Sequence, residues 1–170
     1  DGVAIVERPP QPPVEAVASR RVTPERRPPA TIPPGCRVLL AEDGENNQEL
    51  IAYLLRGADI EVVVVENGAQ AVEEATAAAV SGHPFDLILM DIQMPVMDGY
   101  LATTLLRQTG YTGPVVALTA NAMVGDREKC VAAGCDDYLT KPIRSKELLA
   151  AVTLHAGRTH PTAAGLSTVS

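Results

Sequence analysis

From residue 36 onward, short apolar runs alternate with longer segments in which apolar residues recur every three or four positions. The short runs are rich in Val, Leu and Ile, which is typical of strands buried on both faces of a parallel sheet. The longer segments have the apolar stripe of amphipathic helices. The expected strands are 37–41, 61–65, 87–90, 115–118 and 137–140, and the expected helices are 46–56, 68–80, 99–108, 122–133 and 146–155.

Turn and capping residues support these boundaries. Gly57 and Gly134 stand where two helices should end, while Asp98 and Ser145 precede two others as expected N-caps. Five strands that alternate with five helices predict an α/β fold with a doubly wound parallel sheet and right-handed crossovers. The second expected strand is followed only by Glu66-Asn67, which is consistent with a place at the edge of the sheet.

The first 35 residues differ from the rest of the chain, because they hold nine of its fourteen prolines. Such proline density prevents regular helix or sheet and favours extended conformations, so we expect 1–35 to be a disordered linker. Pro9–Pro13 is interpreted as part of a semi-rigid spacer, with docking to an aromatic groove as the alternative. We expect one domain over 36–156 and a flexible tail over 157–170.

Composition narrows the class of protein. The net charge of −7 argues against direct nucleic-acid binding and suits binding of a cation. No apolar run is long enough for a membrane helix, and no signal-peptide pattern is present. The three cysteines lack zinc-type spacing and are interpreted as reduced thiols of a cytoplasmic protein. Because the chain begins with Asp, we interpret it as a piece of a longer protein.

Polar residues follow four of the five expected strands in a pattern with chemical meaning. Glu42 and Asp43 follow the first strand, Asp91 the third, Thr119 the fourth and Lys141 the fifth. The carboxyl ends of parallel strands meet at one edge of the sheet, where such folds bind ligands. We therefore expect three carboxylates, a hydroxyl and an ammonium group to lie close together.

Three neighbouring carboxylates repel one another, so a positive group must offset their charge. Mg²⁺ prefers carboxylate oxygens and keeps several waters, and Lys141 adds a further positive charge. A metal, a lysine and a hydroxyl around one carboxylate form a cradle for a phosphoryl group, and Asp91 can be the nucleophile that forms an acyl phosphate. The alternatives are that Asp91 merely caps the next helix, or that Lys141 forms a structural salt bridge with the acids.

At this point the sequence resembles a known family, the receiver domains of two-component response regulators, especially receivers attached to hybrid histidine kinases. Four motifs in the same order carry the resemblance, which covers about residues 36–156. They are VLLAED at 38–43, LILMDIQMP at 87–95, VALTA at 116–120 and YLTKP at 138–142. The resemblance implies a flavodoxin-like fold with a five-stranded sheet of order 2-1-3-4-5. One departure is Gly44-Glu45, where hybrid-kinase receivers often carry Asn-Pro, which leaves the shape of the adjacent loop open.

The resemblance also implies roles for individual residues. Asp91 would accept a phosphoryl group from a phosphohistidine of a histidine kinase or a histidine phosphotransfer domain. The Mg²⁺ ligands would be Glu42 (through water), Asp43, Asp91 and the backbone carbonyl of Gln93. Lys141 would pair with the phosphoryl oxygens. Pro142 follows at a tight corner where Lys141 must turn inward, and we expect the Lys141–Pro142 bond to be cis, as the resemblance also implies.

Signal output is expected from a different part of the domain. The resemblance implies that Thr119 moves to bond the phosphoryl group and that Tyr138 follows as an aromatic switch. The surface formed by helix 122–133, strand 137–140 and helix 146–155 would then change, and it could support a weak homodimer. A static, half-buried Tyr138 is the alternative that the residues alone leave open.

A second class of function is an aspartyl-phosphate-forming phosphatase or hydrolase on a similar sheet. Enzymes that resemble the haloacid dehalogenase group need Asp-x-Asp directly after the first strand, where this chain has Glu42-Asp43-Gly44-Glu45. A receiver fold that no longer accepts phosphate is disfavoured because no residue of the cradle is missing. We therefore expect a phosphoacceptor domain that is not itself an enzyme. It would be the carboxyl-terminal receiver of a hybrid kinase, in the cytoplasm or tethered there to a membrane-bound kinase.

Overall fold

The computed structural model describes residues 32–121 and 123–156, so most of the expected linker and the whole expected tail lie outside the described residues. The elements within this part alternate regularly between strand and helix. They are β1 Arg37–Ala41, α1 Glu45–Arg56, β2 Glu61–Val65, α2 Gly68–Val80, β3 Leu87–Asp91, α3 Gly99–Gln108, β4 Val115–Thr119, α4 Val124–Ala133, β5 Asp137–Thr140 and α5 Ser145–Ala156.

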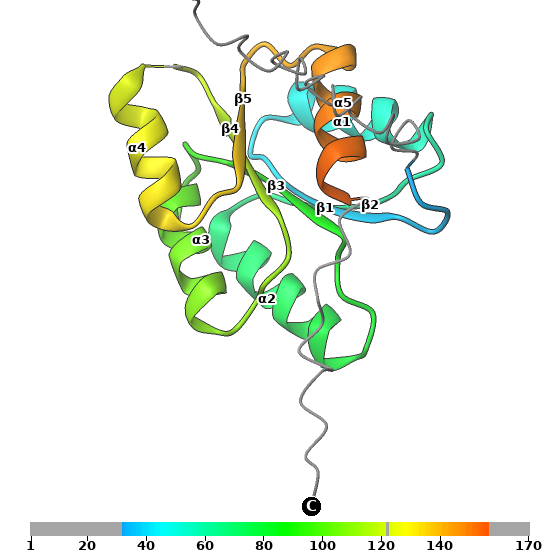
Figure 1. Ribbon diagram of the computed structural model, residues 1–170, viewed down its shortest axis with the longest axis horizontal. Coiled ribbons are helices and arrows are strands. Elements are labelled where there is room, and N and C mark those ends of the chain that lie inside the picture. The colour runs from blue at the N-terminus through cyan, green and yellow to red at the C-terminus, as the bar shows by residue number, and fades with distance from the viewer. Residues whose placement is uncertain (1–31, 122, 157–170) are drawn as a thin grey trace, which may run out of the picture. The chain divides into compact units, whose positions relative to one another are not determined.

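The strands of the described residues form one five-stranded sheet with the order β2-β1-β3-β4-β5, and every neighbouring pair is parallel. This is the expected topology, and it confirms that the second strand lies at an edge. Figure 1 shows α1 and α5 on one face of the sheet and α2, α3 and α4 on the other. The result is a three-layer α/β sandwich with β3 in the middle of the sheet.

The two-residue period of the strands divides the core between these faces. On β3, Leu87 and Leu89 pack with α1 and α5, whereas Ile88 and Met90 pack with α2, α3 and α4. All four side chains are fully buried, as expected for a central strand of a parallel sheet. The same alternation holds along β1 and β4, and it decides which way the polar residues at the strand ends point.

Most local signals act as expected. The Asp98 side chain caps α3 by accepting a hydrogen bond from the Leu101 amide at 2.8 Å. Gly134 ends α4 with φ of +103°, a left-handed conformation that favours glycine. The expected N-cap at Ser145 is wrong, because α5 begins at this residue and the Leu148 amide already bonds to the Arg144 carbonyl. Five elements have the expected bounds: β1, β2, α2, α3 and β5. The ends of α1, α4, α5, β3 and β4 move by one or two residues, so that β3 and β4 include Asp91 and Thr119.

The described chain begins with a turn that leads into β1. The Cys36 amide donates to the Pro33 carbonyl at 3.2 Å, and Ile32 packs on the core beside α1 and α5. Packing therefore starts before the expected domain boundary at residue 36. Cys36, Cys130 and Cys135 are all buried free thiols. Within 32–121 and 123–156, no helix has both the length and the apolar character to cross a membrane.

Candidate functional site

Three charged side chains meet at the carboxyl edge of the sheet because they share one strand face. Asp91 follows Leu87 and Leu89 on β3, so the two-residue period points it toward the α1 and α5 side. Glu42 and Lys141 continue the same face just beyond β1 and β5. Backbone hydrogen bonds from Glu42 to Val65 (3.1 Å) and from Lys141 to Thr119 (2.7 Å) extend the strand pairing to these two residues.

Lys141 is the cation at the centre of this group. Its Nζ lies 2.9 Å from Glu42 Oε2 and 2.9 Å from Asp91 Oδ2. Both acids are almost inaccessible, with 1% and 3% of their surface exposed. Buried charges are tolerated only when they are paired, so the lysine is required to hold two carboxylates in this position.

The remaining oxygens of the two buried acids bind nearby donors. Glu42 Oε1 accepts from the Gly44 amide at 3.1 Å and from Asn47 Nδ2 at 3.5 Å. Asp91 Oδ1 accepts from the Gln93 amide at 3.2 Å. The first residues of the loop after each strand therefore fold back to fix the acid that precedes them.

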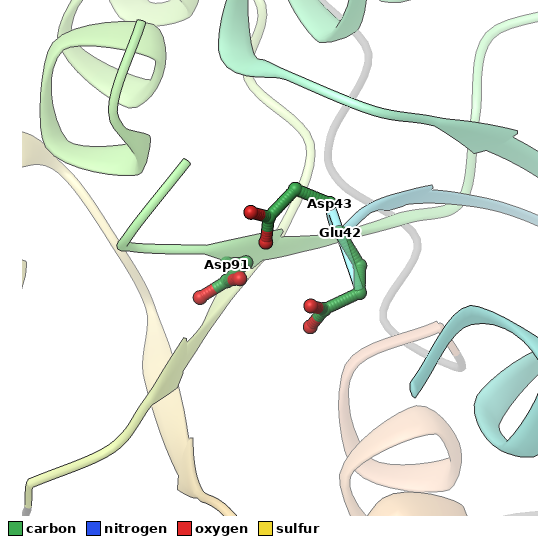
Figure 2. A group of neighbouring side chains, drawn as sticks. All are labelled: Glu42, Asp43 and Asp91. Carbon is green, nitrogen blue, oxygen red and sulfur yellow. The ribbon is translucent and has the colours of Figure 1, made fainter. Parts of the chain in front are cut away.

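Asp43 brings a third carboxylate to the site from the opposite strand face. One oxygen each from Glu42, Asp43 and Asp91 lie within 4.8 Å of one another. Figure 2 shows the three side chains converging from the ends of β1 and β3. Three carboxylates face a single lysine, so the group carries an uncompensated negative charge. Oxygen donors that are this close and under-neutralised fit a hard divalent cation such as Mg²⁺.

The electrostatics agree with this arrangement. Burial raises the pKa of Asp91 to about 6, and the negative charge of Glu42 adds to the rise, against the opposing effect of Lys141 and the Gln93 amide. Burial lowers the pKa of Lys141, but its bonds to Glu42 and Asp91 outweigh this, and the net pKa is raised. Lys141 is therefore charged at neutral pH, and Asp91 is mainly ionised.

An open cleft of about 650 Å³ lies beside the acids. It is lined by Asp43 and Thr119 at the strand ends, by Gln93 and Pro95 from the loop after β3, and by Lys129 of α4, among others. Asp43 is exposed to this cleft, whereas Asp91 lies behind it. The cleft provides room for a ligand beside the exposed carboxylate of Asp43.

The two expected switch residues lie on the cleft side of the sheet. Thr119 is buried, and its Oγ1 donates to the Asn121 carbonyl at 2.9 Å and accepts from the Asn121 amide at 3.2 Å. Tyr138 is half-buried, packs on the core beside α4, and lines a small cavity of about 90 Å³ with Arg127 and Val131. The Lys141–Pro142 peptide bond is cis, as expected.

Sequence reasoning missed several residues that shape the site. Asn47 lies on α1, and its side chain donates to Glu42. The Gly44 amide also donates to Glu42, so the loop at Gly44-Glu45 folds back onto the Glu42 carboxylate. Gly99 packs so tightly that a Cβ there would clash with the Asp91 carbonyl oxygen. In the sequence Asp98-Gly99 is visible only as a turn and helix start, because the close approach is a tertiary feature.

Residues 38–153 match the family described as Response regulator receiver domain. This chain belongs to that family. Its receiver is 45% identical over 113 residues to the signal transduction histidine-protein kinase BarA of Escherichia coli, a match that covers 65% of this chain and 12% of the kinase. The chain spans 3% to 16% of the length of the first hybrid and sensor kinases that it matches.

Among the solved structures that this chain resembles, one receiver contains a metal ion and another is bound to a partner protein. The receiver domain of the sensor histidine kinase PA1611 from Pseudomonas aeruginosa, with a magnesium ion coordinated in its active site cleft, is 42% identical. It covers 73% of this chain and 99% of its own, with a TM-score of 0.65. The Ssk1 receiver of Saccharomyces cerevisiae, co-crystallised with the histidine phosphotransfer protein Ypd1, is 31% identical, covers 72% and 90%, and has a TM-score of 0.64.

Proposed function

We propose that this receiver domain accepts a phosphoryl group on Asp91. The observation that carries the proposal is the geometry of the buried acid: Asp91 Oδ2 is held 2.9 Å from Lys141 Nζ, with two further carboxylates beside it. An ionised carboxylate beside cationic groups is a nucleophile for phosphoryl transfer, which needs mainly positioning and charge neutralisation.

The donor would be the phosphohistidine of a histidine kinase or a histidine phosphotransfer protein. One Asp91 oxygen forms a bond to phosphorus while the P–N bond breaks, and the imidazole nitrogen keeps the electron pair and takes up a proton. Lys141 is positioned to pair with the phosphoryl oxygens. Glu42, Asp43, Asp91 and the Gln93 carbonyl would hold Mg²⁺, which when bound supplies the positive charge that offsets the acids and the phosphoryl group.

The direct test is to incubate the chain with acetyl phosphate and Mg²⁺ and to measure its intact mass. We expect one phosphoryl adduct in the wild type, none in Asp91→Asn, and none in the wild type with excess chelator. Asp98→Asn is a matched control, because Asp98 caps α3 near the cleft but lies outside the acid group. An adduct at full yield in Asp91→Asn would show that another residue is the acceptor.

We also propose that the domain acts as a switch rather than as an enzyme. In the phosphorylated state the Thr119 hydroxyl would leave Asn121 and bond to the phosphoryl group, with a charge-assisted gain of about 1.5–3 kcal/mol. Tyr138 would then move into the space beside β5 and change the α4-β5-α5 surface, where a weak homodimer could form. With beryllofluoride as the phosphoryl mimic, chemical shifts along α4 and β5 should change in the wild type and change much less in Thr119→Ala.

The parent protein is proposed to be a hybrid histidine kinase in which this receiver lies toward the carboxyl end, in the cytoplasm or tethered to a membrane-bound kinase. The sequence identity to BarA and other histidine kinases supports a kinase as the parent protein. The proline-rich segment 1–35 would be the linker and 157–170 a flexible tail. Limited proteolysis should cut between Arg20 and Arg27 and leave a stable core.

The net charge of −7 supports a protein partner rather than nucleic acid.

A further inference from the structure

The loop that carries Gln93 is folded against a second element that sequence reasoning did not connect with the site. This loop, residues 92–98, joins β3 to α3 and contributes to the wall of the cleft. It is closed at its base, where the Gly99 amide donates to the Ile92 carbonyl at 3.0 Å. At its far end the Gly68 amide, the first of α2, donates to the Met97 carbonyl at 3.1 Å.

Gly68 allows this contact because it has no side chain. A Cβ atom at this position would lie 2.6 Å from the Met97 carbonyl oxygen, 3.1 Å from the Asp98 carbonyl oxygen and 2.9 Å from Ala102 Cβ. Two of these three neighbours are backbone atoms, which cannot move aside as the end of a flexible side chain can. Any other residue at Gly68 must therefore push the loop or the start of α3 away from α2.

The loop needs such support because its tip is strained. Val96 has φ of +69°, a conformation that is a genuine outlier for a β-branched residue. The Met97 amide bonds back to the Pro95 carbonyl at 2.7 Å, so Val96 is the central residue of a tight three-residue turn. Its side chain is 85% exposed and gains nothing from packing. Strain of this kind persists only where surrounding contacts fix the conformation.

We propose that Gly68 is a positioning residue for phosphoryl acceptance at Asp91. The bond from its amide fixes Met97, which holds the strained turn at Val96. This turn then determines the path of the loop that follows Asp91 and carries Gln93. This inference rests on the proposed function for the role of the Gln93 carbonyl in holding Mg²⁺.

The first test is Gly68→Ala, measured by calorimetric titration with Mg²⁺ and by the rate of labelling with acetyl phosphate. We expect the Kd for Mg²⁺ to rise about tenfold, as when an outer residue that orients a metal ligand is lost. Raising the Mg²⁺ concentration should recover much of the labelling rate. The matched control is Ala75→Gly, which weakens the same helix at a buried site away from the loop and should leave the Kd within about twofold of the wild type.

A second substitution separates positioning of the loop from general loss of stability. Val96→Gly removes the steric cost of positive φ, so the loop can make its turn without the full support of α2. The double variant Gly68→Ala/Val96→Gly should recover a Kd within about threefold of the wild type. If the affinity lost in Gly68→Ala is unaffected by Val96→Gly, or is equalled by Ala75→Gly, the positioning role is wrong.

Two readouts in the wild type keep the idea testable even if Gly68→Ala folds poorly. In the metal-free wild type, the Met97 amide should exchange slowly with solvent because its bond to Pro95 is held in place. In Mg²⁺ titrations followed by NMR, the Gly68 and Gln93 amides should shift with the same midpoint. A Gly68 amide that does not respond, while Gln93 does, would overturn the inference. A wild type that neither binds Mg²⁺ nor accepts phosphate would instead overturn the proposed function.

Discussion

Charged side chains are arranged differently where the parallel strands begin (the amino edge) and where they end (the carboxyl edge). At the amino edge, Arg107 of α3 uses its whole guanidinium group. It donates to the carbonyls of Tyr111, Gly113 and Gly134 at 2.7–3.0 Å and forms an ion pair with Asp136 at 2.9 Å. The Asp136 carboxylate also accepts from the Val115 amide at 2.9 Å. These charges are matched by partners, and the network ties the loop before β4 to the loop before β5.

At the carboxyl edge, the charges are only partly matched. Lys141 pairs with two buried acids, and Asp43 adds a third carboxylate that forms no ion pair among the described residues. The loop beside them contains a strained Val96. The difference indicates that the amino edge holds the fold together, whereas the carboxyl edge keeps an excess of negative charge that a bound cation would offset.

The largest expected effect on stability comes from a substitution of Arg107 at the amino edge. Arg107→Met keeps the apolar stem but leaves several carbonyls and Asp136 without their donor, so the free energy of unfolding should fall by about 3 kcal/mol. Urea unfolding followed by circular dichroism measures this loss. Mg²⁺ affinity should stay within about twofold of the wild type, because metal contacts lie at the other edge.

The control for this prediction is Arg107→Lys, which keeps the charge but cannot reproduce the planar fork of donors. It should lose most of the same stability. A large change in Mg²⁺ affinity in either variant would mean that the two edges are coupled, and the comparison would fail.

A smaller effect is expected from the pH dependence of the carboxyl edge. The pKa of Asp91 is raised to about 6 in the folded state, so the folded protein holds this proton more tightly than the unfolded chain does. The resulting stability is fully present below the unfolded pKa of about 4 and is lost as pH rises through about 6. In chelator, the wild type should therefore lose about 2 kcal/mol relative to Asp91→Asn between pH 4 and pH 7.

Subtracting the Asp91→Asn curve removes the contribution of the other carboxylates, which titrate in both proteins. Saturating Mg²⁺ should oppose the loss, since metal binding requires the deprotonated acid and stabilises the folded state more at higher pH. Parallel stability curves for the two proteins in chelator would show that Asp91 titrates normally.

The smallest change in stability is expected at Asp43. Asp43→Asn removes repulsion at the under-compensated edge, but the side chain is exposed and screened, so the metal-free protein should gain only about 0.5 kcal/mol. The same change should weaken Mg²⁺ binding by about tenfold or more, because a carboxylate ligand is lost. Thermal unfolding with and without Mg²⁺ measures both effects. A variant that loses stability in chelator would show that Asp43 is not repelled by its neighbours.

The strand pattern of this protein could be predicted from the sequence because it depends on local features. Runs such as Leu87–Met90 are too apolar for any place except a central strand, and glycines such as Gly134 end helices by their own conformational preference. The convergence of Glu42, Asp43, Asp91 and Lys141 also followed, since parallel strand ends must share one edge. The Ser145 cap was wrong by one residue, because the position of a helix end depends on the geometry of the preceding loop.

Other features were decided only by the tertiary structure. Glycine at positions 68 and 99 permits close packing between elements that are distant in the chain, and nothing in the local sequence distinguishes them from ordinary turn glycines. The partners of Arg107 lie on two separate loops. The sequence by itself determined which groups gather at the carboxyl edge, because strand direction and the two-residue period are local. Only the tertiary structure decided how closely they are held, because that depends on contacts between separate elements.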